Sequence, residues 1–215
     1  MFMIFLLACL LGGYLLGSLN ASIIFGFMKG SDIRNSGSKN AGMTNTLRVF
    51  GKKAAVFVFV FDLLKAIISV VLARYVAGVL YGPESDMVQY AKYLAGFGAI
   101  LGHNFPLYFK FKGGKGILSS WGVIMILDWR IAILLIVVFL LVVVLTRYVS
   151  LASIISATIY PLFVILLNLY QFKITTTPYY IVLSLLMAAL AVYRHRGNIQ
   201  RLCAGTESKL GQKKE

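Results

Sequence analysis

Charged residues are scarce in this sequence, and acidic residues are scarcer still. Only 13% of the 215 residues are Asp, Glu, Lys or Arg, while 60% are hydrophobic; an ordinary soluble domain carries about 25% charged residues. A water-soluble fold of this size cannot bury so much apolar surface in one core, whereas a bilayer accepts it as the outer faces of several helices. The composition therefore predicts an all-α, polytopic membrane helix bundle.

Cysteine and histidine are also few, which excludes several kinds of site. Cys9 lies in an apolar run and Cys203 in a polar tail, so we expect neither a metal site nor a disulfide from them. The sequence has only two histidines. We predict no metal ion and no cofactor.

The shortage of acids leaves seven Asp and Glu against 21 Lys and Arg, a net charge of +14. In a soluble protein this balance would indicate nucleic acid binding. Here the basic residues cluster between apolar runs, so membrane topology and an anionic lipid or substrate are the better interpretation. No nucleic acid and no obligate protein partner is expected.

Long apolar runs are what the sequence does have. A transmembrane helix needs about 20 residues, or roughly 17 at the low end. The run at 117–127 is therefore too short to cross alone, and five or six crossings are the alternative to seven. Because the first charge of any kind is Lys29, we expect the first run to be a retained spanning helix and not a cleaved signal. The runs are 2–28, 54–73, 93–109, 117–127, 131–145, 149–167 and 179–193.

Basic residues are distributed unevenly between the two sets of polar segments. Sixteen lie in 29–53, in 110–115, at Arg147 and in the tail from Arg194. Cytosolic loops carry the excess of Lys and Arg, so we predict an external N-terminus, a cytosolic C-terminus and therefore an odd number of spans. No internal repeat is evident, and residues 1–215 are predicted to form a single integral-membrane domain. The opposite segments hold only Arg74, Lys92, Arg130 and Lys173.

The first of three polar segments on the predicted cytosolic side runs from 29 to 48. Its glycines permit close approach of the backbone to a ligand, and Arg48 offers a bidentate fork for phosphate oxygens. It lacks the spacing of a Walker A loop. Taken alone, a solvated basic loop explains it equally well. The candidate side chains are Ser38, Asn40, Thr44, Asn45 and Arg48.

The second segment, 102–116, ends in a dense run of glycine and lysine. Glycines around Lys115 at the start of a helix near Ile117 predict an anion site, since backbone N–H groups and the positive helix end would face the ligand. A flexible hinge with topology-setting lysines is the alternative. His103 is expected to be a hydrogen-bonding residue at a helix end rather than a base. The candidate binding residues are Lys110, Gly113, Gly114, Lys115 and Gly116.

The third segment begins at Arg194, where the last span leaves the membrane. His195 has a side chain whose ordinary pKa, about 6.5, suits proton handling, although a plain stop-transfer anchor is the alternative. Inside the second span, Asp62 and Lys65 lie three residues apart on one helix face and are predicted to form a structural ion pair. Ser150 and Ser153 lie at the cytosolic start of the sixth span.

The three segments together form an ordered pattern. It reads Gly-Ser-x-Asn-x-Gly-x-Thr-Asn-x-x-Arg, then Gly-His-x-Phe-Pro with Phe-Lys-Gly-Gly-Lys-Gly, then His-Arg-x-Asn-Ile-x-Arg-Leu-x-x-Gly-x-Glu. This pattern closely resembles the bacterial acyl-phosphate:glycerol-3-phosphate acyltransferase (PlsY) family from Gly17 to Gly211. The departures from that family's pattern, such as Lys39, Met43 and Ala66, fall on no residue assigned to chemistry.

The resemblance implies a reaction and a place. A fatty acyl group would pass from acyl phosphate to the 1-hydroxyl of glycerol 3-phosphate, giving lysophosphatidic acid and inorganic phosphate in phospholipid biosynthesis. The active site would face the cytosol at the bacterial cytoplasmic (inner) membrane, in contact with membrane lipid. A transporter for a phosphorylated small solute is the alternative function. A membrane scaffold would not explain three polar motifs on one side.

The resemblance also implies residue roles. Ser38 and Arg48 match essential residues, and Gly113–Gly116 match a glycerol-phosphate loop. His195 and Asn198 match a pair linked to activity, Glu207 a structural acid, and Ser153 a serine lining the pocket. Ser38, Arg48, His195 and Asn198 are predicted to converge on one pocket. No Ser-His-Asp arrangement is legible, so direct transfer is favoured over an acyl-Ser38 intermediate; the proton acceptor is either His195 or a substrate phosphate.

Overall fold

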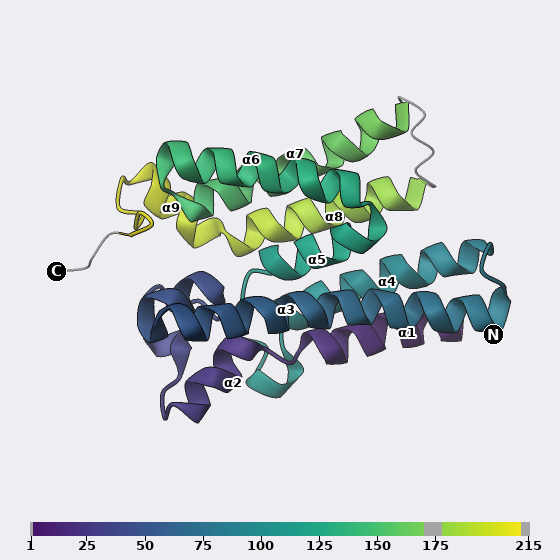
Figure 1. The fold of residues 1–215 in the computed structure, drawn as a ribbon, viewed down its shortest axis with the longest axis horizontal. Coiled ribbons are helices and arrows are strands. Elements are labelled where there is room, and N and C mark those ends of the chain that lie inside the picture. The colour runs from purple at the N-terminus through teal and green to yellow at the C-terminus, as the bar shows by residue number, and fades with distance from the viewer. Residues whose placement is uncertain (1, 170–177, 212–215) are drawn as a thin grey trace. The chain divides into compact units, whose positions relative to one another are not determined.

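The computed structural model describes residues 2–169 and 178–211, which contain helices and turns but no strand. Figure 1 follows the chain by colour from the N-terminus to the C-terminus. The chain divides into two compact units, Met1–Leu127 and Asp128–Glu215. Among the basic residues counted for topology, Lys173, Lys213 and Lys214 lie outside the described residues.

Each of the seven apolar runs contributes a helix, which confirms the predicted all-α membrane bundle. Within the described residues, four segments are long and apolar enough to cross a bilayer: Phe2–Met28, Met43–Tyr81, Trp129–Thr146 and Val149–Leu167. The predicted short run is α5, with its 11 residues as expected. The helices are α1 (Phe2–Gly17), α2 (Ala21–Met28), α3 (Met43–Tyr81), α4 (Asp86–Asn104), α5 (Ile117–Leu127), α6 (Trp129–Thr146), α7 (Val149–Leu169), α8 (Pro178–Arg194) and α9 (Arg196–Cys203), with 3₁₀ turns η1 (Ile33–Asn35) and η2 (Leu107–Phe109).

The first apolar run is broken into α1 and α2, a division that hydropathy alone did not predict. The Ser18 hydroxyl donates to the Tyr14 carbonyl at 2.7 Å, and the Asn20 side chain caps α2 by accepting from the Ile23 N–H at 3.2 Å. Short polar side chains compete with the helical ladder in this way and favour helix ends. The break leaves the Leu19 carbonyl to accept a bond from Lys65 on α3 (2.8 Å).

Small residues allow α1 and α4 to pack closely. A Cβ at Gly13 or Gly17 of α1 would overlap the backbone of Ala95 or Ala99 of α4. In the reverse direction, Gly98 and Gly102 of α4 lie against backbone carbonyls of α1. Spanning helices approach closely at such small residues, because lipid supplies no hydrophobic driving force for their association.

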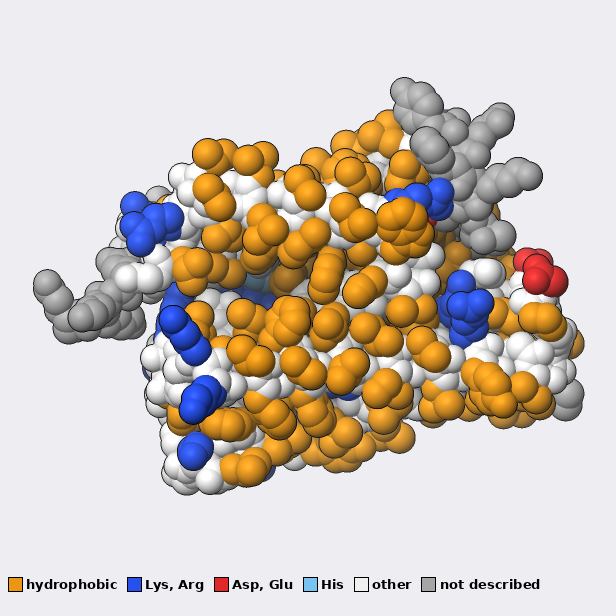
Figure 2. Space-filling model, viewed as in Figure 1, with side chains coloured by type: hydrophobic (Ala, Val, Ile, Leu, Met, Phe, Trp, Pro, Cys, Tyr) orange, Lys and Arg blue, Asp and Glu red, His pale blue; other side chains and the backbone are white. Residues whose placement is uncertain are grey.

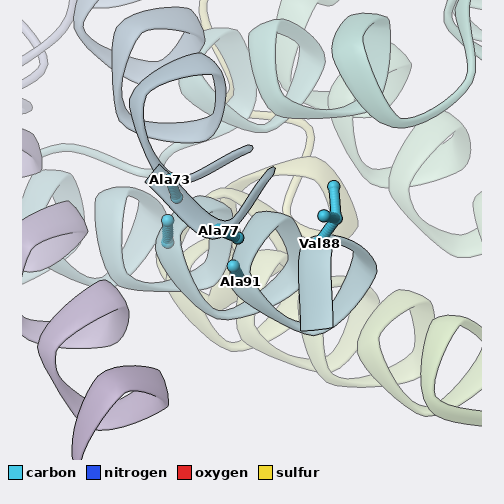
Figure 3. Close-up of a cluster of buried hydrophobic side chains, with 5 residues drawn as sticks. Ala73, Ala77, Val88 and Ala91 are labelled. Atoms are coloured by element: carbon cyan, nitrogen blue, oxygen red, sulfur yellow. The ribbon is translucent and has the colours of Figure 1, made fainter. Parts of the chain in front are cut away.

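The contact of α3 with α4 is built on the same principle. Ala73 and Ala77 of α3 meet Val88 and Ala91 of α4 in a buried cluster, in which alanines let the two backbones approach (Figure 3). A short turn that begins at Gly82 connects α3 to α4. The first unit is therefore a tightly packed set of helices that holds its loops at fixed positions.

The α3 helix is longer than its apolar run, because it already begins at Met43 inside the first polar segment. Gly51 has φ 82° and ψ −174°, so it interrupts the helical geometry between the polar start and the apolar remainder. In Figure 2, apolar side chains cover the middle of α3, while basic side chains gather over the end where the helix begins. This pattern is typical of a helix that leaves the bilayer.

The second unit consists of α6, α7, α8 and α9, with α7 in contact with each of the other three. Tyr160 of α7 and Tyr180 of α8 are buried and meet edge to face, 6.4 Å between ring centroids. The segment after α9 returns to the turn between α6 and α7, where the Leu210 N–H donates to the Arg147 carbonyl at 2.7 Å.

Candidate active site

Ser38 lies in a tight turn that a buried asparagine holds. The Ser38 N–H donates to Asn45 Oδ1 (2.8 Å), and Asn45 Nδ2 donates to the carbonyls of Ser36 (3.0 Å) and Ile33 (3.2 Å). A Cβ at Gly37 would overlap Asn45 Oδ1, and φ there is +60°. Asn45, predicted to bind substrate, thus organises the turn, while the Ser38 side chain is exposed.

Arg48 lies on the first turns of α3 and not in a loop. Thr44 precedes it by four residues, so the two side chains share a helix face. The Arg48 side chain is exposed, and the structure shows no hydrogen bond or ion pair to it from the described residues. Its guanidinium is therefore available to an anionic ligand. Asn40 is partly buried just before this helix.

The glycines of the second motif are needed for packing. The Gly114 N–H donates to the His103 carbonyl at 3.0 Å. A Cβ at Gly114 would overlap the His103 ring and crowd the Ala41 carbonyl, and a Cβ at Gly113 would overlap the His103 carbonyl and the Pro106 ring. The loop therefore lies directly against the end of α4 and against the first motif.

The residues after these glycines lead into α5. Gly116 has φ +78°, and its carbonyl accepts the first helical bond, from Ser120 (2.7 Å). The N–H groups of the first helical turn have no partner within the helix and point along its axis, as an anion site requires. Lys115, directly before them, is partly buried; Lys110 is exposed and has φ +57°.

Arg34 joins the two motif loops and was not predicted as a site residue. Its Nη1 donates to the carbonyls of Phe109 (2.9 Å) and Lys112 (3.1 Å), and its Nη2 pairs with Asp32 Oδ2 (2.7 Å). The hydrogen bond from Arg34 lowers the pKa of the Asp32 carboxyl below its ordinary value. In the sequence, both residues look like ordinary charges of a cytosolic loop.

Asp62 and Lys65 pair as their spacing predicted. Lys65 Nζ lies 2.8 Å from Asp62 Oδ1, and both side chains are almost fully buried. His103, at the last turn of α4, is the third member of the cluster, with its Nδ1 3.1 Å from Lys65 Nζ. The cluster lies beneath the second-motif loop, because His103 also contacts Gly114.

His195 is buried at the start of α9 in the second unit. Its Nδ1 lies 2.7 Å from the Ala191 carbonyl. A carbonyl can only accept, so Nδ1 carries the proton, and in the neutral ring Nε2 is the acceptor nitrogen. This is the tautomer that a general base needs.

Glu207 gathers three side chains of the second unit. Its carboxylate accepts from Ser150 Oγ (3.0 Å), Asn198 Nδ2 (2.9 Å) and Arg201 Nε (2.8 Å). Burial raises the pKa of Glu207, but these hydrogen bonds outweigh it and hold the pKa below its ordinary value. Ser153 is buried, and its hydroxyl donates to the Val149 carbonyl (2.8 Å).

The structure brings the first and second motifs together within the first unit. His195, Asn198, Ser153 and Glu207 belong to the second unit, where Asn198 and Glu207 are in direct contact. Convergence of His195 and Asn198 with Ser38 and Arg48 on one pocket stays a prediction. In residues 2–169 and 178–211, no three or more His, Cys, Asp or Glu residues are grouped so as to hold a metal ion.

Comparisons with known proteins agree with this arrangement. The sequence profile of the family described as Glycerol-3-phosphate acyltransferase matches residues 7–205. A Glycerol-3-phosphate acyltransferase of Halalkalibacterium halodurans is 44% identical over 207 residues, 95% of each chain. Another, of Thermoanaerobacter sp., is 43% identical over 203 residues, 94% of each chain.

Solved structures give the same result. The crystal structure of PlsY, an integral membrane glycerol 3-phosphate acyltransferase, in its glycerol 3-phosphate form has a TM-score of 0.81 and 35% identity over 96% of both chains. Its lysophosphatidic acid form has a TM-score of 0.79 and 34% identity, over 96% of this chain and 95% of that one.

Apolar spans, polar motif loops and these relatives define a multi-pass membrane acyltransferase. The chain belongs to the glycerol-3-phosphate acyltransferase family, and its predicted resemblance to PlsY is confirmed. The names of the relatives favour the acyltransferase over the transporter alternative.

Proposed function

We propose that this chain transfers a fatty acyl group from acyl phosphate to the 1-hydroxyl of glycerol 3-phosphate, giving lysophosphatidic acid and inorganic phosphate. The observation that supports this most directly is the contact between the two motif loops of the first unit. Gly114 packs against the Ala41 carbonyl, and Arg34 bonds to Phe109 and Lys112. The two loops thereby form one basic surface with binding groups for two phosphates, and each of the two proposed substrates carries a phosphate group.

The two phosphates call for different partners. The start of α5 with Lys115 offers N–H groups and a positive charge, and we assign it to glycerol 3-phosphate. The exposed guanidinium of Arg48 offers a planar fork, and we assign it to acyl phosphate, whose charge it neutralises. The exposed Ser38 hydroxyl is assigned to the acyl carbonyl oxygen, to which it donates as negative charge develops there.

The reaction needs positioning more than activation. The glycerol hydroxyl oxygen attacks the acyl carbonyl carbon, a new C–O bond forms, and the bond from that carbon to the phosphate oxygen breaks. Phosphate departs with the electron pair of the broken bond. It is a good leaving group, so holding the reactants at near-attack distance and neutralising charge supply most of the catalysis.

The proton of the attacking hydroxyl has two acceptors in this proposal, His195 Nε2 or a phosphate oxygen. The bond from Nδ1 of His195 to Ala191 supports the first, because it leaves Nε2 of the neutral ring as the nitrogen that accepts a proton. A protein base gives kcat a falling limb at low pH, where the base is protonated. Loss of that limb in His195→Asn, with residual activity, assigns the proton to His195; an unmoved profile assigns it to phosphate.

A defined assay tests the function itself. Detergent-purified protein is given acyl phosphate with or without glycerol 3-phosphate, and phosphate release and the acylated product are measured together. We expect both only when glycerol 3-phosphate is present. Sustained phosphate release without it, beyond one equivalent per enzyme, or no product with it, contradicts the proposal.

Direct transfer and a covalent intermediate are separable in the same preparation. With acyl phosphate alone, direct transfer leaves Ser38 unmodified, and intact-mass spectrometry of the protein shows no added acyl group. An acyl adduct on Ser38 that disappears on addition of glycerol 3-phosphate would establish the covalent route instead.

The membrane orientation is proposed from the charge asymmetry: an external N-terminus and a cytosolic active site in the bacterial cytoplasmic membrane. Single cysteines at Ser85 and Ser208, with Cys9 and Cys203 replaced by Ala, are labelled with an impermeant reagent in intact cells. We expect labelling at Ser85 only. Labelling of both positions from one side contradicts the orientation.

A further inference from the structure

Lys65 lies inside the first unit with three polar partners around its ammonium group. Its Nζ lies 2.8 Å from Asp62 Oδ1, 2.8 Å from the Leu19 carbonyl and 3.1 Å from His103 Nδ1. An ammonium group has three donors and no acceptor. It donates to two of these partners, the Leu19 carbonyl and His103, and attracts the third, the Asp62 carboxylate, by charge. The three partners come from α3 itself, from the break between α1 and α2, and from the end of α4.

His103 connects this buried charge to the glycine-rich loop. Because an ammonium can only donate, Nδ1 of His103 is the acceptor of the Lys65 bond. On the other side of the ring, Gly114 lies so close to Nε2 that a Cβ on it would overlap that atom. The Gly114 N–H also donates to the His103 carbonyl at 3.0 Å. The imidazole is therefore held between Lys65 and Gly114.

A structural ion pair would need only Asp62 and Lys65. Buried charges within spanning segments are costly and usually mark functional positions. Here the additional contacts reach outward, through His103, to the loop whose N–H groups are assigned to a phosphate. Gly114 in turn abuts the Ala41 carbonyl of the first motif, so the ring sets the position of the loop against that motif.

We propose that Lys65 and His103 are positioning residues for glycerol 3-phosphate. The Lys65–His103 bond fixes the ring, the ring fixes Gly114, and Gly114 fixes the direction of the N–H groups that lead into α5. The inference rests on the proposed function, because it assumes that this loop binds glycerol 3-phosphate. It assigns neither residue a contact with substrate.

The test compares two replacements of His103. His103→Leu removes the acceptor of the Lys65 bond, and we expect the KM for glycerol 3-phosphate to rise about tenfold, with the KM for acyl phosphate within about twofold. His103→Asn keeps an acceptor near the place of Nδ1, so that KM should stay within about threefold of the wild-type value. A merely structural histidine would lower stability without this split between substrates.

Ser69→Ala is the matched control on α3. Ser69 is buried one turn after Lys65, and its hydroxyl donates to the Lys65 backbone carbonyl at 2.7 Å. Its removal leaves the Lys65 side chain and His103 in place, so both KM values should stay at the wild-type level. If His103→Leu does not fold, His103→Gln, with its acceptor displaced by one carbon, replaces it in the comparison with His103→Asn.

The outcomes separate this inference from the proposed function. An unchanged KM for glycerol 3-phosphate in the Leu or Gln variant, or an equal rise for both substrates, overturns the inference while wild-type activity upholds the function. If the wild-type protein transfers no acyl group, the proposed function fails. The inference about glycerol 3-phosphate then fails with it. In an active protein, amide exchange at 112–117 is a second readout: faster exchange in His103→Leu than in Ser69→Ala supports the inference, and equal exchange overturns it.

Discussion

The two polar regions of this enzyme use their motif residues differently. In the first unit, Ser38 and Arg48 are exposed, while Asn45 and Arg34 hold the loops by hydrogen bonds to the backbone. In the second unit, a residue predicted to be catalytic, Asn198, is itself part of the scaffold, because it donates to the Glu207 carboxylate.

This difference separates two kinds of motif residue. An exposed side chain without an internal partner contributes little to folding, so its replacement should lower activity and leave stability unchanged. A side chain inside a hydrogen-bonded network contributes to both, because its loss leaves buried partners unsatisfied. Measuring activity and melting temperature on the same variants therefore tests the comparison directly.

Arg48→Lys should have the largest effect on activity. A lysine keeps the positive charge but cannot form the bidentate fork, so we expect kcat/KM to fall about a hundredfold, as for loss of one transition-state donor. The melting temperature should not change, because Arg48 has no protein partner in the described part of the chain. Lys53→Gln, an exposed basic residue nearby on α3, is the control and should retain activity. A large drop in melting temperature for Arg48→Lys would place Arg48 with the scaffold residues.

Glu207→Gln should affect stability first. An amide can still accept from Asn198 and Ser150 but brings an N–H group toward Arg201, so we expect a loss of about 1–2 kcal/mol. For a protein of this size that lowers the melting temperature by about 2–8 °C. Glu84→Gln, an exposed acid, should leave it unchanged. Full stability with abolished activity would instead give Glu207 a role in the chemistry.

The stabilising effect of Glu207 should also depend on pH in one direction. Its pKa is depressed in the folded protein, so its contribution is complete above the unfolded value, about 4.3. It is lost as the pH falls through the lower folded value, because the unfolded chain then binds more protons. Melting curves of the wild type and Glu207→Gln should therefore converge on acidification; a constant difference would contradict this.

Gly114→Ala should weaken glycerol 3-phosphate binding more than turnover. A methyl group at this position would overlap the His103 ring and displace the loop. We expect the KM for glycerol 3-phosphate to rise about tenfold with a much smaller change in kcat. Gly12→Ala, where a Cβ on α1 would meet nothing within 4 Å, is the control. An unchanged KM would move the phosphate site elsewhere.

The positions of the helices were predictable because each apolar run is visible in a short stretch of sequence, without knowledge of its tertiary contacts. The short run at 117–127 coincides with α5 (Ile117–Leu127), and the run from 149 begins with α7. The break between α1 and α2 was not predicted, although Ser18 and Asn20 are residues that end helices, because it lies within an uninterrupted apolar run. Its stabilising partner, Lys65, is distant in sequence.

The site was predictable in composition but not in contacts. Spacing and resemblance predicted Ser38, Arg48 and the glycines as site residues, and these stay predictions; neither showed that the Asn45 side chain holds the turn of the chain. A sequence motif shows which residues occur together, but it does not show which atoms their side chains hydrogen-bond to. Arg34 was missed for the same reason: a positive charge in a cytosolic loop is already explained by topology.

Arg34→Lys should have the smallest effect on activity. It tests the comparison of the two units most closely, because Arg34 stabilises the loops of the first unit, where Ser38 and Arg48 are exposed. A lysine cannot bond to Asp32 and to the carbonyls of the second loop at once. Because the Arg34 side chain is 20% exposed, we expect a cost of about 1 kcal/mol, which corresponds to a rise of roughly fivefold in the KM for glycerol 3-phosphate. The control is Lys112→Gln, which removes a charge from the same loop but keeps the Lys112 carbonyl that Arg34 contacts. If Arg34→Lys leaves KM unchanged, Arg34 acts only through its charge; if Arg34→Lys raises KM and Lys112→Gln does not, the bonds between the loops position the substrate.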